Sequence, residues 1–129
     1  MNSTKLTNLI LHRHGSRPDV RLFRNETAGA WVGKKVGTTG KGDVVLRHAR
    51  MIQAGLAPGS ADLIGMKIDD VGAQHPVARF VSIEVKTGSD RLKKKQRAWA
   101  KLMRSMGALH CVARSVEDVD DLLGPPPTP

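Results

Sequence analysis

Three residues have the types and spacing for metal-assisted phosphate chemistry: Asp62, Glu84 and Lys86. Glu84 and Lys86 lie two positions apart in a segment rich in β-forming residues. Side chains alternate between the faces of a strand, so this carboxylate and this amine point the same way. Asp62 follows a Pro-Gly-Ser-Ala turn and opens a short apolar strand. If that strand pairs with residues 77–86, Asp62 faces Glu84, and two hard oxygen ligands with a lysine alongside form a Mg²⁺ site.

Such a site suits phosphoryl chemistry. The metal would neutralise the scissile phosphate and lower the pKa of a bound water. Lys86 would position or deprotonate that water and offset charge in the transition state. The Glu84–Lys86 pair alone is explained more simply as a surface ion pair. Asp62 shifts the balance towards a site.

A polar residue on a helix adds to this interpretation. At 100° per residue, Leu92, Trp99, Met103 and Met106 fall on one arc, with Gln96 in its middle. A buried amide must find hydrogen-bond partners. A site just beyond the strand end would provide them, and a backbone group is the alternative partner.

The opposite side of the same helix is basic. Residues 91–104 contain seven Lys or Arg and no acid: Arg91, Lys93, Lys94, Lys95, Arg97, Lys101 and Arg104. Like charges at helical spacing repel, so the run favours an anionic partner over a merely solvated face. DNA phosphates are the leading candidate.

Composition agrees with a nucleic-acid partner. The chain has 129 residues, a formal net charge of +9 and 40% hydrophobic residues, which fits one domain with a single core. Two Trp, two Phe and no Tyr leave few platforms for stacking unpaired bases, which favours contact with the phosphate backbone. A lone Cys111 excludes a disulfide framework and a thiolate zinc site. We expect an intracellular, cytoplasmic protein with no membrane span.

The elements that must position these residues follow from local patterns. We expect strands over residues 19–25, 61–66, 77–86 and 109–113, and helices over residues 90–106 and 115–123. Residues 1–15 form either a loose arm, with His12 and His14 exposed, or a short helix. Residues 29–42 are predicted to be a Gly-rich, Lys-rich loop, and residues 44–55 are ambiguous between helix and strand. Residues 124–129 are predicted to be a disordered Pro-rich tail. The fold class is α/β, with helices packed on a mixed sheet.

These motifs together resemble a known nuclease pattern. Residues 59–65 (Gly-Ser-Ala-Asp-Leu-Ile-Gly), 83–86 (Ile-Glu-Val-Lys) and 96–99 (Gln-Arg-Ala-Trp) are similar to the PD-(D/E)xK pattern. In particular they resemble the virus-type replication-repair nuclease (VRR-NUC) domain. The similarity spans about residues 16–122, and we take residues 16–123 as the domain.

The resemblance implies a restriction-endonuclease-like core and Mg²⁺- or Mn²⁺-dependent cleavage of DNA phosphodiesters. By position, it makes Asp62, Glu84 and the Val85 backbone carbonyl metal ligands, Lys86 the catalytic lysine and Gln96 a supporting residue. Free-standing members resemble archaeal junction resolvases, which act as homodimers on four-way (Holliday) junctions. This chain shows no fused helicase or DNA-reading domain, which fits the free-standing type.

Some assignments stay open. The family often has an acid on its first helix, and the candidates here are Asp19 and Glu26. Arg24 and Asn25 are candidates to orient a phosphate, with pairing to sheet-end carbonyls as the alternative, and Lys34 and Lys35 are candidates to touch the DNA backbone. The alternative functions are a flap- or duplex-cleaving nuclease of the same fold and a non-catalytic basic DNA-binding protein.

Overall fold

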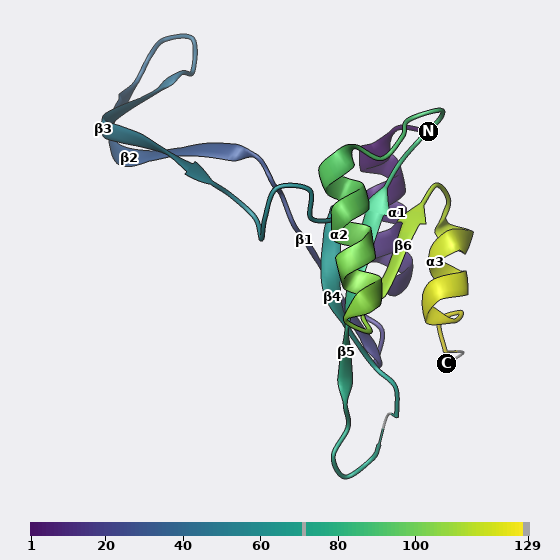
Figure 1. The fold of residues 1–129 in the computed structure, drawn as a ribbon. Coiled ribbons are helices and arrows are strands. Elements are labelled where there is room, and N and C mark those ends of the chain that lie inside the picture. The colour runs from purple at the N-terminus through teal and green to yellow at the C-terminus, as the bar shows by residue number, and fades with distance from the viewer. Residues whose placement is uncertain (71, 128–129) are drawn as a thin grey trace.

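The computed structural model describes residues 1–70 and 72–127, and it is a mixed α/β fold. Four strands form the central sheet in the order β1-β4-β5-β6 (Figure 1). The elements, in chain order, are α1 (Ser3–His14), β1 (Val20–Arg24), β2 (Gly29–Thr38), β3 (Val44–Gln53), β4 (Leu63–Ile68), β5 (Ala78–Val85), α2 (Lys94–Ser105), β6 (Leu109–Ala113) and α3 (Val116–Leu123). The predicted mixed central sheet with flanking helices is confirmed.

The sheet has two antiparallel pairs of neighbouring strands and one parallel pair. β4 is antiparallel to both β1 and β5, and β6 is parallel to β5. A parallel neighbour requires a crossover connection, and α2 supplies it between β5 and β6. In the register of β4 and β5, Leu63 lies opposite Ile83. This register brings Asp62, the residue before β4, level with Glu84 near the C-terminal end of β5.

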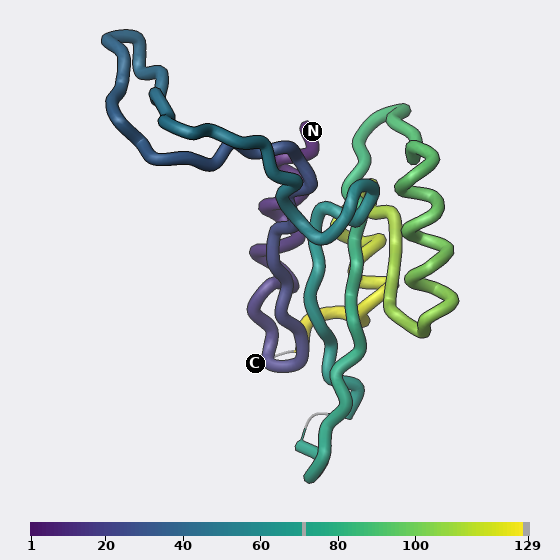
Figure 2. The backbone as a smooth tube through the Cα atoms, turned by 60° about the vertical axis from the view of Figure 1, so that its left-hand side comes forward, coloured from purple at the N-terminus to yellow at the C-terminus, as the bar shows by residue number. Residues whose placement is uncertain are grey.

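The hydrophobic core lies on one face of the sheet. Leu6 and Ile10 of α1 and Val119 and Leu123 of α3 are buried there, and they pack against a row of strand side chains that includes Ile83. Figure 2 shows α1 on this side of the sheet and α2 on the other. Residues 3–14 therefore form a helix that belongs to the core.

The other face of the sheet is polar, because the intervening residues of β5 point towards α2. Ser82 accepts a hydrogen bond from Trp99 Nε1 at 2.8 Å and lies 3.0 Å from His110 Nδ1. Buried Glu84 continues the same row. The alternation predicted for this strand is therefore present, with aliphatic side chains facing the core and polar ones facing α2.

Residues 29–53 form a long antiparallel hairpin of β2 and β3, where a loop and an ambiguous segment were predicted. The hairpin pairs with no strand of the central sheet. It projects from the body at the end of the sheet where the N-terminus lies (Figures 1 and 2). The prediction failed because this hairpin is held by its backbone ladder and largely lacks the buried apolar face by which strands are recognised.

A polar network closes the opposite end of the molecule. Buried His14 lies 2.7 Å from Asp120 Oδ1 through Nε2 and 3.0 Å from Arg17 Nη1 through Nδ1. Burial lowers the pKa of His14. Arg17 also donates to the carbonyl of Gly124 at 2.8 Å, which ties the first residue of the predicted tail to the body. The expected exposure of His14 on an arm was wrong, because this histidine joins α1 to α3. The last two residues of the predicted tail, 128 and 129, lie outside the described residues.

Within the described residues, no helix is both long enough and apolar enough to cross a bilayer.

Candidate active site

Asp62 reaches its position through a tightly held loop. The Asn25 amide donates to Ser60 Oγ and to the Ala61 carbonyl, both at 2.8 Å, and accepts from the Leu56 backbone N–H at 3.0 Å. These bonds lock the chain immediately before Asp62. The Asp62 carboxylate then accepts from the Val85 backbone N–H at 2.8 Å, which holds it against the end of β5.

Gly59 makes this loop compact. Its φ is +86°, a conformation that favours glycine, and an added Cβ would lie 2.6 Å from backbone atoms of Lys95. The loop therefore packs directly on the first turn of α2. This contact fixes the carboxylate side and the helix side of the site relative to each other.

Glu84 lies inside the protein rather than at its surface. It is 4% exposed. Burial, followed by the negative charge of Asp62, raises its pKa to about 8, and Lys86 partly offsets this effect. Two carboxylates beside each other in a poorly solvated place are costly when both are ionised. The pair gains from any cation placed between its oxygens.

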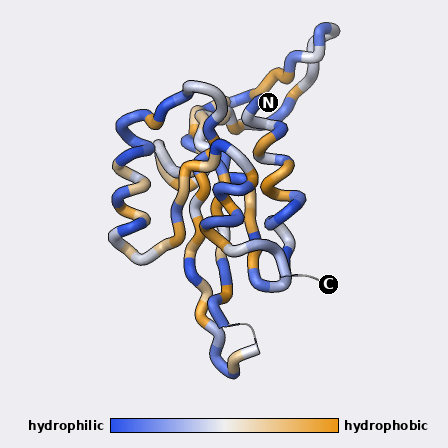
Figure 3. The backbone as a smooth tube through the Cα atoms, turned by 90° about the vertical axis from the view of Figure 1, so that its right-hand side faces the viewer, coloured by the Kyte–Doolittle hydropathy of each residue, from blue (hydrophilic) through white to orange (hydrophobic). Residues whose placement is uncertain are grey.

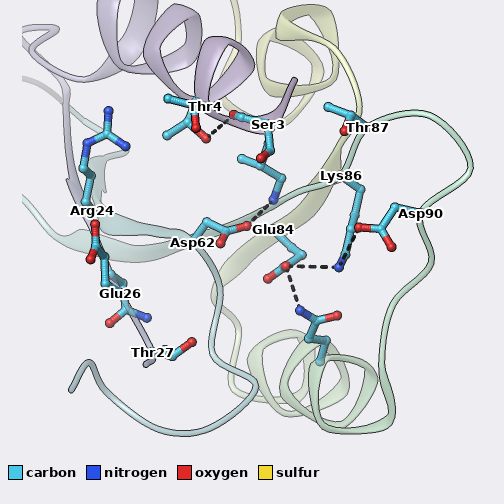
Figure 4. Close-up of a pocket in the computed structure, with 14 residues that line it drawn as sticks. Ser3, Thr4, Arg24, Glu26, Thr27, Asp62, Glu84, Lys86, Thr87 and Asp90 are labelled. Atoms are coloured by element: carbon cyan, nitrogen blue, oxygen red, sulfur yellow. Dashed lines mark hydrogen bonds and ion pairs between the residues drawn. The ribbon is translucent and has the colours of Figure 1, made fainter. Parts of the chain in front are cut away.

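Lys86 lies between two acids, as Figure 4 shows. Its Nζ is 3.7 Å from Glu84 Oε1 and 3.5 Å from Asp90 Oδ2. The side chain is buried, whereas that of Asp90 is 63% exposed. The amine is thus fixed beside Glu84 at the base of a cavity, with one side towards the more open Asp90.

Gln96 occupies the position that the helix pattern predicted. Its Nε2 donates to Glu84 Oε1 at 2.9 Å, and its Oε1 accepts from the Lys93 backbone N–H at 2.8 Å. The amide therefore links the buried carboxylate to the N-terminus of α2. The sequence had left open whether this amide serves the site or a backbone group, and the structure shows that it does both.

These residues line one cavity of about 360 Å³ (Figure 4). Its lining includes Asp62 just before β4, residues 84–87 at the end of β5, and Gln96 of α2. Ser3, Thr4 and Thr7 of α1 form another wall. The sequence analysis missed these hydroxyl groups. Nothing in the Ser-Thr pattern near the N-terminus predicts that these hydroxyl groups lie next to the strand ends.

The two candidate acids for an additional metal ligand lie in different places. Glu26 lines the cavity. Asp19 forms a bidentate pair with Arg17, with distances of 2.9 and 2.8 Å, at the opposite end of β1. Neither lies on a helix, and α1 contains no acidic residue. Threonine and serine hydroxyls occupy the part of the cavity that α1 reaches.

The donor set fits a magnesium-like cation with few protein ligands. Among the described residues, no group of three or more His, Cys, Asp or Glu side chains is arranged to hold a metal. Mg²⁺ is commonly bound through one or two carboxylates, with waters and substrate phosphates completing its shell. Asp62 and Glu84 meet that requirement, and Val85 lines the same cavity. A site with a full set of protein ligands, typical of structural zinc, is not formed by these residues.

The predicted DNA-contacting residues fall into three groups. Arg24 lines the cavity and bonds to Asn8 of α1. Buried Asn25 donates to the Ala61 carbonyl, next to the start of β4, so it pairs with a sheet-end carbonyl as the alternative interpretation proposed. Lys34 and Lys35 are exposed on the projecting hairpin. Around the start of α2, all the predicted cations are exposed: Arg91, Lys93, Lys94, Lys95 and Arg97. Figure 3 shows the hydrophilic character of this part of α2.

Comparisons with known proteins give no family assignment. No protein-family model matches the chain, and no curated protein matches its sequence.

Proposed function

We propose that this chain is a divalent-metal-dependent endonuclease that hydrolyses DNA phosphodiester bonds, with a PD-(D/E)xK site of the VRR-NUC kind. One observation carries the proposal. Asp62, Glu84 and Lys86 come from two strand ends and meet in one cavity, where Gln96 bonds to the central carboxylate. The residues that the sequence motifs singled out for chemistry (Asp62, Glu84, Val85, Lys86 and Gln96) all line this cavity.

Each side chain has a role that its contacts support. Asp62 and Glu84 would hold Mg²⁺ or Mn²⁺, with the Val85 carbonyl as a further ligand. When bound, the metal would polarise the scissile phosphate and acidify a water molecule. Gln96 keeps one Glu84 oxygen oriented by donating to it.

Lys86 supplies the remaining charge. Its amine is held by Glu84 and Asp90 at the cavity floor, where it can orient a water or donate to a phosphate oxygen. Fixed positive charge beside the phosphate stabilises the extra negative charge of the transition state. An amine already in place needs no rearrangement during the reaction.

DNA is the substrate class that the charge distribution supports. The net charge of +9 and the exposed cations around the N-terminus of α2 favour a polyanion. Within the described residues, Lys93, Lys94 and Lys95 form no ion pair with a carboxylate. These cations therefore remain available to phosphates close to the cavity.

The finer form of the proposal is a restriction-endonuclease-like core that acts as a homodimer on four-way junctions. The mixed sheet with helices on both faces supports that core. Each chain carries Asp62, Glu84 and Lys86 once, so paired nicks across a junction require two copies related by symmetry. A flap- or duplex-cleaving nuclease with the same site is the alternative.

A cleavage assay tests the function. Labelled four-way junction, flap and linear duplex are each incubated with Mg²⁺, Mn²⁺ or EDTA. Lys86→Ala should reduce cleavage by about 100-fold or more while DNA binding persists, because it removes a preorganised positive charge. Lys101→Ala is the matched control, since Lys101 is an exposed lysine of α2 and lies outside the cavity.

The outcomes separate the candidates. Paired nicks in the junction that disappear with EDTA and with Lys86→Ala would support the junction-resolving form. Full cleavage by Lys86→Ala would remove Lys86 from the mechanism. Salt-sensitive binding without a product under any metal would favour the basic DNA-binding protein.

A further inference from the structure

The projecting hairpin carries a basic face that the proposed chemistry does not use. Residues 29–53 contain five Lys or Arg and one acid, Asp43. Within the described part of the chain, none of these cations forms an ion pair with a carboxylate. Asp43 lies near the tip, where it contacts Thr39. The hairpin is therefore strongly positive along most of its length.

Its register gathers charge on one side. Lys34 lies directly opposite Arg47, and Val32 lies opposite Arg50 on the same face. Two like charges facing each other across strands destabilise the pairing, and a two-stranded hairpin without a packed face is only marginally stable in water. An anionic partner would remove this repulsion.

The other face of the hairpin differs in character. Trp31 lies opposite Met51 there, and these side chains are 62% and 57% exposed. This apolar pair is the feature that would suit a protein partner. A second copy of the chain, however, brings another hairpin of the same positive charge. The charge balance therefore favours a polyanion over self-association.

The dimensions of the hairpin suit duplex DNA. Each strand has ten residues and spans roughly 33 Å, close to one turn of B-DNA at about 34 Å. The major groove admits a two-stranded ribbon. Register shifts occur after Val32 and after Lys35, and His48, with φ of 52°, lies at the first of them. Such bulges increase the right-handed twist of a ribbon, which helps it follow a helical groove.

The hairpin is also connected to the candidate active site. A second cavity, of about 480 Å³, is lined by Gln53 at the base of the hairpin and by three lysines at the start of α2. Thr27 and Gln96 line both this cavity and the one that holds Glu84. The two cavities therefore adjoin at Thr27 and Gln96, and the second is lined both by lysines of α2 and by the base of the hairpin.

We propose that the hairpin of residues 29–53 is a DNA-binding ribbon, whose basic face of Lys34, Arg47 and Arg50 binds duplex DNA beside the cut site, in the major groove. This inference rests on the proposed DNA substrate. It assigns the hairpin to the duplex that flanks the scissile phosphate, with the lysines of α2 holding the phosphates in between.

Equilibrium binding tests the inference independently of cleavage. The probe is a labelled linear duplex in EDTA, titrated at several salt concentrations. The test variant is Lys34→Gln with Arg47→Gln. The control variant is Arg21→Gln with Lys67→Gln, which makes the same change in net charge at the far end of β1 and β4.

The hairpin variant should bind about ten-fold or more weakly at 0.1 M salt, and its salt slope should fall by about two, because two phosphate contacts are lost. The control should stay close to wild type. Equal weakening of DNA binding in both variants would overturn the inference, because it would show that binding depends on net charge and not on the hairpin.

Two other results would also overturn the inference. Unchanged DNA binding by the hairpin variant would exclude the DNA-binding ribbon. If the same variant also lost self-association in light scattering, the hairpin would instead bind a second copy of the chain. Wild-type protein that does not bind duplex at all would exclude both the ribbon and the DNA substrate. Hairpin-dependent binding without cleavage in Mg²⁺ or Mn²⁺ would contradict only the nuclease.

Discussion

Glu84 makes the sharpest prediction, because its protonation should control the stability of the metal-free protein. Glu84→Gln removes the ionisable group while keeping the shape of the side chain and an oxygen that can accept from Gln96. Lys86 retains Asp90 as an ionic partner. The substitution therefore changes the charge of the site more than its packing.

The size of the effect follows from the pKa of Glu84, which burial and Asp62 raise from 4.5 to about 8. The folded protein keeps this proton up to about pH 8, whereas the unfolded chain loses it near pH 4.5. The free energy of unfolding therefore falls as the pH rises between these values. At about 1.4 kcal/mol per pH unit, ionisation of Glu84 costs the folded state at most roughly 5 kcal/mol, shared with Asp62.

Urea denaturation in EDTA at pH 5 and pH 8.5 measures this cost. Wild type should lose several kcal/mol more than Glu84→Gln between the two conditions. Glu26→Gln is the matched control, since it removes a carboxylate that lines the same cavity but leaves Glu84 in place. Its loss should equal that of wild type.

Mg²⁺ should restore the stability that is lost. A cation bound by Asp62 and Glu84 stabilises the folded state at pH 8.5 by mass action, by about 2.7 kcal/mol at 100 times its Kd. Glu84→Gln should gain little. Parallel pH profiles for wild type and Glu84→Gln in EDTA would refute the reasoning, because they would show that Glu84 ionises as easily in the folded protein as in the unfolded chain.

Three further predictions concern the scaffold, and each is checked by urea denaturation. Gly65→Ala should destabilise the fold by about 3 kcal/mol, because an added Cβ would lie 1.8 Å from the Arg21 carbonyl oxygen. Gly37→Ala is the control and should cost far less, since the space around Gly37 is open. Equal costs would contradict the close approach of β1 and β4. Ile10→Ala should lower the free energy of unfolding by about 2–5 kcal/mol, because Ile10 is fully buried. Leu9→Ala should lower it much less, since Leu9 is more exposed. Similar losses would show that α1 does not pack on the sheet through Ile10. Burial, with a smaller contribution from Arg104, lowers the pKa of His110 to about 4, so the contribution of His110 to the free energy of unfolding should fall by up to about 3 kcal/mol as the pH drops from about 6.5 through 4, opposite in sign to the effect of Glu84. The difference between wild type and His110→Gln isolates this contribution, and identical pH profiles would show that the histidine is freely protonated in the folded state.

Much of the sheet, and the meeting of Asp62, Glu84, Lys86 and Gln96 in one cavity, was predictable from local pattern. Residues 109–113 were predicted as a strand and form β6, and residues 77–86 contain β5. In β5, the β-branched residues Val81, Ile83 and Val85 alternate with polar ones, which is why its two faces were predictable. Residues 90–93 were predicted to be helical but precede the helix. The Lys93 N–H donates to the Gln96 side chain, so Lys93 caps α2, which begins at Lys94.

The rest depended on tertiary contacts that no local pattern records. The burial of His14 requires Arg17 and Asp120, which lie on separate segments and meet only after folding. The contribution of Ser3, Thr4 and Thr7 to the cavity likewise depends on how α1 packs across the sheet. For Asn25 the sequence offered either phosphate orientation or pairing with sheet-end carbonyls, and its bonds to the loop before Asp62 emerge only in the folded structure.

The independence of the hairpin from the body has a consequence for modularity. β1 and β4 are neighbours in the sheet, although residues 25–62 separate them in the chain. At the base of the hairpin, the Ala54 N–H bonds to the Ala28 carbonyl at 2.9 Å, so the two ends of the excursion already meet. A chain lacking residues 29–53 would close a shorter loop and spare about 1 kcal/mol of closure entropy. The hairpin thus resembles an insertion that can be removed or exchanged while the body keeps its fold, so that the hairpin and the candidate site can evolve separately.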